Sequence, residues 1–207
     1  MTTTDIANSA LALLGELAIT SIDDTASPQA RLCKQFVAGA VAETLRLGRW
    51  NCATKRATLN RLADPPPDGS FDYYYQLPND CLRVMEINGE EFCDSTEYYE
   101  VEGQRLACND SSVALRYISG ATVTLDPLLA NAVAMRLAYK IAVPLSGSTE
   151  KSAFMLQMFG KALAEARQVD AQESGSRENS GWDRVLGRSR LLNGRRVTRD
   201  PLRIEKT

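Results

Sequence analysis

The apolar positions follow two different periods along the chain. In the first fifty or so residues, and again from residue 127 onward, apolar side chains recur every three or four positions, which is typical of helices with one buried face. Between residues 54 and 124 the apolar runs are short and are separated by turn residues, which is typical of antiparallel strands. After about residue 171 neither period continues.

Two helices are predicted before the strands. Thr3 or Thr4 can cap the first helix and Gly15 can end it, while serine followed by proline at residues 27–28 starts the second, with Gly48 as its stop. Ile19 and Ile22 in the connecting loop are expected to pack on the core. The predicted core faces consist of Ile6, Ala10, Leu13 and Leu14, and of Leu32, Phe36, Val37, Ala40, Val41 and Leu45.

The stretch YYYQLPNDCLRV, residues 73–84, predicts a reversal of the chain. Pro78 cannot donate a ladder hydrogen bond and Asn79 and Asp80 favour a turn, so the tyrosine strand and the strand Leu82–Ile87 are expected to form a hairpin. Asn88 followed by Gly89 is a second, two-residue hairpin signal. Because side chains alternate along a strand, the three tyrosines cannot share one face, and at least one ring is expected to be exposed or in an interface.

Two more helices are predicted after the strands. Aspartate and proline at residues 126–127 start the first, which Pro144 and Gly147 are expected to break. It is apolar nearly all round, which indicates either the centre of a bundle or a helix covered by a partner. Its main stripe is Leu129, Val133, Leu137 and Ile141, with Arg136 and Lys140 on a polar edge. Ser148 can cap the last helix, whose predicted inner face is Met155, Met158, Phe159, Ala162, Ala166 and Val169.

The predicted fold class is therefore α+β: an antiparallel bundle of about four helices with an inserted small antiparallel β subdomain and an extended C-terminal arm. The expected parts are the N-terminal helices of the bundle at residues 1–53, the β subdomain at 54–124, the C-terminal helices at 125–172 and a docking arm at 173–207. The arm is rich in Ser, Gly and Arg but retains Trp182 and several leucines, which purely disordered segments usually lack. We expect it to become ordered on a partner, a plain disordered end being the alternative.

The amino-acid composition excludes several classes of catalytic and metal-binding site. The chain has no histidine, which excludes Ser-His-Asp and Cys-His nucleophile systems and His-ligated metals, and it carries no phosphate-binding glycine motif. Its five cysteines are widely spaced without a C-x-x-C, so we expect reduced structural thiols, no metal and no cofactor. The N-terminus lacks the basic region of a signal peptide, and no apolar run reaches the roughly 20 residues of a membrane span. A soluble chain without a membrane partner is expected.

One basic run is the strongest candidate for a charged surface. It has no acid between Glu43 and Asp64, although the formal net charge of the whole chain is −2. Positive residues are favourable near a helix C-terminus, which accounts for Arg46 but not for the later residues. The alternative is a patch that faces DNA or another subunit, provided the side chains share one face. Its members are Arg46, Arg49, Lys55, Arg56 and Arg61.

The order of several segments resembles one family. ALALLGELAITSIDD is followed by LGRWNCATKRATL, YQLPNDCLRV, LDPLLANAVAMRLAYKIAVPLSGS and LAEARQVDAQES. In this order, across roughly residues 4–175, the chain is similar to the tail tubular protein A family of short-tailed bacteriophages, the head-to-tail adaptors. The resemblance implies a ring, typically dodecameric, between the portal and the tail nozzle of the virion, assembled in the host cytoplasm, and no enzyme activity. It also implies a helical bundle carrying a β subdomain.

The resemblance further implies partners for particular residues. The C-terminal arm would bind the portal, through Trp182, Arg184, Val185, Leu186, Arg188, Arg190, Leu191, Leu192, Arg195, Arg196 and Val197. The β turns would meet the nozzle or the tail fibres, through Pro78, Asn79, Asp80, Asn88 and Gly89. The basic run would line a channel through which DNA passes without sequence-specific contacts.

Two other functions stay open at the level of the sequence. A polysaccharide or cell-wall hydrolase acting at phage entry requires a pair of carboxylates, and the sequence nominates no such pair. A free nucleic-acid-binding module requires an affinity that falls steeply with salt, and an isoelectric point near 5.4 disfavours it.

Overall fold

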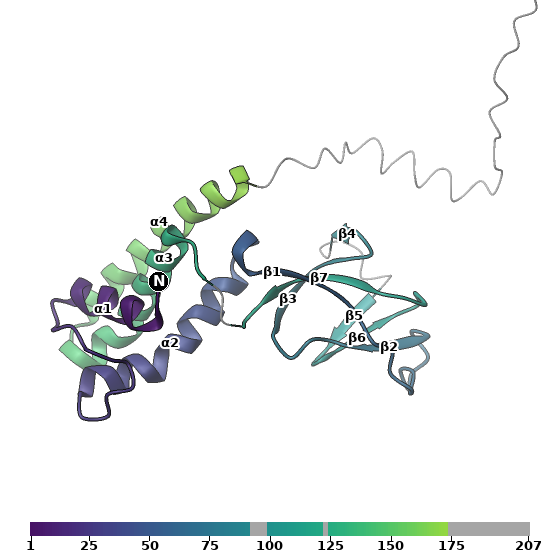
Figure 1. The fold of residues 1–207 in the computed structure, drawn as a ribbon, viewed down its shortest axis with the longest axis horizontal. Coiled ribbons are helices and arrows are strands. Elements are labelled where there is room, and N and C mark those ends of the chain that lie inside the picture. Colours follow the sequence, from purple (N-terminus) through teal and green to yellow (C-terminus); the bar gives the residue numbers. More distant parts are fainter. Residues whose placement is uncertain (92–98, 122–123, 174–207) are drawn as a thin grey trace, which may run out of the picture. The chain divides into compact units, whose positions relative to one another are not determined.

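The computed structural model describes residues 1–91, 99–121 and 124–173, and it has mixed α+β architecture as predicted. Helices α1 (Thr3–Leu14) and α2 (Pro28–Arg46) precede a short 3₁₀ turn, η1 (Asn51–Ala53) (Figure 1). Helices α3 (Pro127–Ser146) and α4 (Thr149–Glu173) follow the strands. The strands are β1 (Thr54–Thr58), β2 (Tyr73–Gln76), β3 (Cys81–Ile87), β4 (Glu90–Glu91), β5 (Tyr99–Glu102), β6 (Arg105–Cys108) and β7 (Ala114–Ser119). The residues predicted to form the C-terminal arm, from 174 onward, lie outside the described residues.

The helix ends follow local hydrogen-bonding groups. Thr2, rather than Thr3 or Thr4, caps α1: its hydroxyl accepts from the backbone N–H of Asp5, whose carboxylate accepts in return from the backbone N–H of Thr2. Gly15 ends this helix with φ of 79°, as expected. The cap is Thr2 and not Thr3 or Thr4 because, of the three, only Thr2 is followed three residues later by an acidic residue, Asp5. Helices α2 and α3 begin at the predicted cap-and-proline pairs.

Pro144 does not end α3, which contradicts the prediction. The helix continues to Ser146 and stops at Gly147, where φ is 65°. Proline removes one intrahelical bond, but here it lies in the last turn, where little helix remains to be disrupted. The hydroxyl of Ser146 also donates to Ala142 O at 2.8 Å. Ser148 accepts from the backbone N–H of Lys151 and so caps α4 as predicted.

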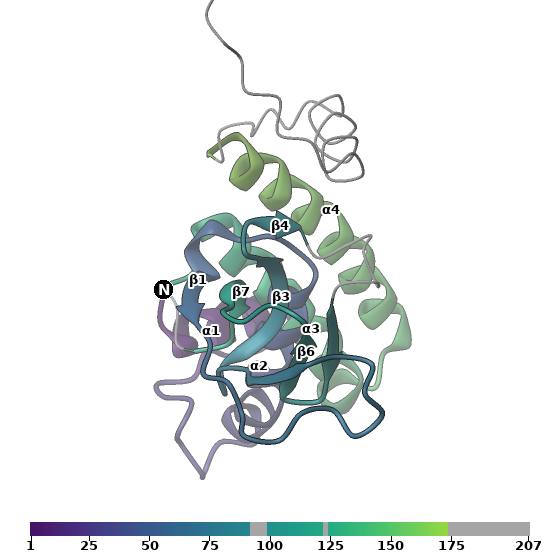
Figure 2. The same cartoon turned by 90° about the vertical axis from the view of Figure 1, so that its right-hand side faces the viewer.

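Helix α3 forms the centre of the bundle and packs on α1, α2 and α4 (Figure 1 and Figure 2). Its predicted stripe, Leu129, Val133, Leu137 and Ile141, is fully buried within the described chain. Length and composition alone would allow α3 to cross a membrane, but its apolar residues contribute to the bundle core. The neighbouring helices bury Leu11 and Leu163, whereas the predicted core residues Leu13 and Val169 are exposed.

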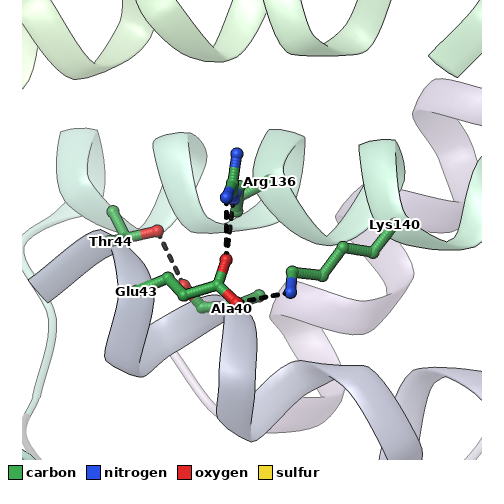
Figure 3. A network of polar contacts seen from close by, with 5 residues as sticks. All are labelled: Ala40, Glu43, Thr44, Arg136 and Lys140. Atoms are coloured by element: carbon green, nitrogen blue, oxygen red, sulfur yellow. Dashed lines mark hydrogen bonds and ion pairs between the residues drawn. The ribbon is translucent and has the colours of Figure 1, made fainter.

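A polar contact joins α2 to this central helix. The carboxylate of Glu43 accepts hydrogen bonds from Arg136 and Lys140, the two residues of the polar edge of α3 (Figure 3). The guanidinium of Arg136 also lies 5.2 Å from the ring centroid of Phe159 on α4. Arg136 therefore contacts elements on both sides of α3.

The strands form two antiparallel sheets, ordered β1-β7-β3-β4 and β2-β6-β5. The hairpin predicted from YYYQLPNDCLRV is wrong, because β2 and β3 belong to different sheets. The turn after Leu77 instead passes the chain from one sheet to the other, and Asp80 O accepts from the N–H of Gly120 at 2.7 Å. The hairpin predicted at Asn88 and Gly89 is confirmed: it joins β3 to β4, and both residues have positive φ, of 52° and 90°.

The two sheets enclose a second core, and strand β3 serves both cores. Val84 packs between the sheets, whereas its neighbour Met85 belongs to the core of the helical bundle. Tyr117 and Ile118 on β7 divide in the same way. Alternation along the strand explains this arrangement, since successive side chains lie on opposite faces. The β unit is thus joined to the bundle through shared apolar packing.

Candidate functional site

The predicted basic run does not form a single surface. Lys55 and Arg56 are neighbours on β1, so their side chains lie on opposite faces of the sheet. Lys55 forms an ion pair with Asp80, with Nζ and Oδ2 2.9 Å apart. Arg61 is stacked on the Tyr73 ring, 3.7 Å from its centroid. Arg56 is exposed and pairs in register with Arg116. Arg46, at the end of α2, is likewise exposed.

Arg49 lies elsewhere, beside a hollow of about 420 Å³ that follows the end of α2. Three segments that are distant in sequence form its walls: the loop after α2, strand β3 and the last turns of α4. The lining residues are Leu47, Gly48, Arg49, Trp50, Arg83, Arg167, Asp170 and Ala171. We call this hollow the arginine pocket, and it is the candidate functional site of the described chain.

Gly48 and Trp50 determine the shape of the loop wall. The Trp50 ring is buried, and its Nε1 donates to Thr44 O in the last turns of α2 at 3.3 Å. The ring crosses directly over Gly48, where an added Cβ would lie 2.4 Å from Cε2 of Trp50. Glycine is therefore required by this close approach. The sequence pattern identified Gly48 only as a helix stop.

Two arginines outside the predicted run complete the pocket. Arg83 Nη1 donates to Arg46 O at 3.3 Å, and Arg167 Nη2 donates to Leu47 O. Both guanidinium groups thus meet backbone carbonyls at the C-terminal end of α2, where positive charge is favourable. Neither arginine forms an ion pair with a carboxylate in residues 1–91, 99–121 or 124–173. Sequence reasoning missed both, since nothing in the sequence brings β3 near the end of α4.

Asp170 contributes the carboxylate of the pocket lining. Its Oδ1 accepts from the backbone N–H of Asn51 at 3.0 Å, and the Asn51 side chain donates to Asp170 O at 3.0 Å. These bonds join the end of α4 to η1. Burial raises the pKa of Asp170, and the Asn51 N–H opposes this shift in part. Three guanidinium groups and one carboxylate therefore line the pocket, which favours an anionic ligand.

The residues predicted to meet a nozzle or fibres have different surroundings. Asp80 is only 28% exposed, and its carboxylate accepts from Ser119 Oγ at 2.6 Å, Lys55 Nζ at 2.9 Å and Tyr117 OH at 3.1 Å. These bonds lower the pKa of Asp80 to about 2, and the bond from Ser119 makes the largest contribution. The Asn88 side chain is bonded to Asp110, Ser112 and Ala114. Asn79 and Gly89 are exposed and Pro78 is half-buried, so these three have the accessible surfaces.

Metal-binding groups and reactive thiols were also considered in the part of the chain that the structure describes. There, no group of three or more cysteine, aspartate or glutamate side chains could hold a metal ion. Burial raises the pKa of the Cys33 and Cys81 thiols to about 11, so both are protonated at neutral pH. The predicted arm residues, Trp182 to Val197, lie outside the described residues. No known family model matches the chain, and a search of curated proteins found no significant match.

Proposed function

We propose that the protein is a structural head-to-tail adaptor of a tailed bacteriophage, which forms a ring between the portal and the tail nozzle. The observation that carries the proposal is the order of elements. Two helices precede a β unit of two sheets, and two helices follow it, which is the order that the segment resemblance implies. The proposed location is the virion, at the head-to-tail interface.

The architecture suits a connector with two kinds of surface. The bundle and the β unit are joined through the shared packing of Met85 and Ile118, so contacts made by the β turns would be carried to the helices. Pro78, Asn79 and Gly89 remain the proposed contacts to the nozzle or fibres. The arm from residue 174 onward remains the proposed contact to the portal.

Self-association in this proposal requires surfaces other than the stripe of α3, since α1, α2 and α4 cover that stripe. Large apolar side chains are exposed on the outer helices and in the loop after α1. Leu17 is 83% exposed and Phe154 is 55% exposed. Helix α4, which carries Phe154, meets the end of α1 where Lys151 Nζ donates to Leu14 O at 3.3 Å. These exposed side chains are candidates for the contact between copies in a ring, which we propose as a dodecamer.

DNA would pass through the ring without sequence-specific contacts. Arg46 and Arg56 are the exposed members of the original basic run that have no described acidic partner, and they are the proposed channel-facing residues. A few positive charges would guide the polyanion without binding it tightly. Charge reversal at Arg56 is expected to alter genome retention or ejection, and an unchanged phenotype would remove this part of the proposal.

The direct test is electron microscopy of the purified protein alone and with the portal of its phage. Rings seated on the portal support the proposal. Deleting residues 176–207 is expected to abolish portal binding while leaving the helical circular dichroism unchanged, because the cores of the bundle and the β unit lie before that point. A protein that stays monomeric on the portal vertex, or a truncated chain that still binds, would contradict it.

A further inference from the structure

Two of the arginines that line the arginine pocket, Arg83 and Arg167, have no carboxylate partner among the described residues. Arg49, Arg83 and Arg167 line it together with Asp170. Arg83 and Arg167 each donate to a backbone carbonyl. A guanidinium has five N–H donors in a fixed fork, so one bond to a carbonyl leaves donors that suit a planar carboxylate.

The two arginines are positioned before any ligand arrives. Their bonds to Arg46 O and Leu47 O hold both side chains at the end of α2, although the arginines come from β3 and α4. Arginines held in this way lose less conformational entropy on binding than free surface arginines do. The pocket therefore has the pre-organisation expected of a binding site, in addition to its role at the helix end.

Shape and lining distinguish between kinds of anion. The hollow of about 420 Å³ lies within the range typical of ligand sites, and it admits a side chain that projects into it. Duplex phosphates, in contrast, lie along ridges and are met by cations spread over an extended surface. Leu47, which is 45% exposed, and Ala171 add apolar surface beside the arginines. This combination fits a carboxylate that is accompanied by an apolar side chain.

We propose that the arginine pocket binds an acidic segment of a partner protein, with a carboxylate between Arg83 and Arg167 and an apolar neighbour against Leu47. The inference does not depend on the adaptor function, since it rests on the pocket alone. It assigns a binding role to Arg83 and Arg167, two residues outside the original basic run.

The test uses the full chain and a labelled peptide with acidic residues on both sides of a leucine, measured by fluorescence anisotropy. Arg83→Gln is expected to weaken binding about tenfold, as is usual for the loss of one charged hydrogen-bond partner. Arg31→Gln is the matched control, because it removes the same charge from an exposed position in the first turn of α2. Asp170→Asn is expected to tighten binding, since it removes the carboxylate of the pocket and keeps an acceptor for Asn51.

Several outcomes would overturn the proposal. Equal losses in Arg83→Gln and Arg31→Gln would mean general charge attraction instead of a site. A second peptide carries Gln and Asn in place of the acidic residues and is used as an unlabelled competitor. Failure of this neutral peptide to displace the labelled acidic peptide supports the proposal, whereas equal binding of the two peptides contradicts it. If inorganic phosphate or a short DNA duplex binds in place of the peptide and loses affinity in Arg83→Gln, the pocket is a phosphate site and the protein-segment assignment is wrong. Arg83→Gln and Arg167→Gln each remove a contact to the end of α2, so the fold of both variants is checked by circular dichroism.

Discussion

Glu43 and Arg136 join α2 to α3 through one carboxylate oxygen. Oε2 of Glu43 accepts from Arg136 Nε at 3.0 Å and from Nη2 at 2.8 Å, while Oε1 accepts from Lys140 Nζ at 2.6 Å (Figure 3). Lys140 contributes most to lowering the pKa of Glu43, and Arg136 adds to the shift. Three groups on two helices therefore act as one polar contact at the edge of an otherwise apolar interface.

Glu43→Gln is expected to lower the free energy of unfolding by about 1 kcal/mol, a modest value because Glu43 is 42% exposed and solvent screens the pair. Urea denaturation followed by helical circular dichroism measures the change. Glu165→Gln on the exposed face of α4 is the control and is expected to have little effect. Equal stability of the two variants would show that the contact contributes nothing.

Asp80→Asn is expected to lower the free energy of unfolding by about 2 kcal/mol, because the amide replaces a carboxylate that accepts three hydrogen bonds. Its folded-state pKa of about 2 lies below the ordinary value of 3.8. The stabilisation is therefore present above pH 3.8 and is lost as the pH falls through about 2.

Acid titration of stability separates this effect from a general loss of fold. The wild type is expected to lose stability over that acidic range more steeply than Asp80→Asn, because the variant has no carboxylate to protonate. Asp64→Asn, at an exposed position, is expected to retain the wild-type dependence on pH. Parallel pH curves for wild type and Asp80→Asn would contradict the network described around Asp80.

Two glycine substitutions are expected to have opposite effects. Gly48→Ala places a methyl group 2.4 Å from Trp50, whose ring is buried and cannot move away easily. We expect a loss of about 1–3 kcal/mol, as in other overpacked sites, with a changed tryptophan fluorescence spectrum. Gly39→Ala lies in the exposed middle of α2 with open space around the new Cβ, and a gain of about 0.5–1 kcal/mol is expected. A stabilised Gly48→Ala would contradict the close approach.

Alkylation of Cys33 and Cys81 is expected to be slow in the folded protein. The pKa of Cys33 and Cys81, raised to about 11 by burial, leaves almost no thiolate at neutral pH. Labelling with iodoacetamide, followed by mass spectrometry of peptides, distinguishes each position. Denaturant is expected to accelerate the labelling of Cys33 strongly. Rapid labelling of Cys33 in the native protein would be inconsistent with its burial.

Helix starts and tight turns could be predicted from the sequence, because each depends on a few neighbouring residues. Helix starts at Ser27 and Asp126 were predictable because a cap residue followed by proline satisfies the first turn without distant partners. The Asn88 turn was predictable for a similar reason, since its conformation depends on two adjacent residues. The break predicted at Pro144 is absent because a proline in the last turn of a helix destabilises it less than one in its interior.

The pairing of strands and the contacts between segments distant in sequence could not be predicted from the sequence. The turn at Pro78 reverses the chain, but the sequence does not reveal that the strands on either side of it join different sheets. The basic run does not form one surface for a related reason: Lys55 and Arg56 are adjacent on a strand, so their side chains lie on opposite faces of the sheet. The arginine pocket requires β3 and α4 to meet at the end of α2, and only tertiary packing brings Arg83 and Arg167 there.

The division of β3 between two cores has a mechanical consequence. Val84 and Met85 are joined by one peptide bond, yet each belongs to a different apolar cluster. Separating the two sheets from the helices would expose Met85 and Ile118, which are buried in the apolar core of the helices. We therefore expect that neither half unfolds independently of the other. Heating should therefore produce a single calorimetric peak that covers helices and strands alike, with β3 serving as the rigid coupling between them.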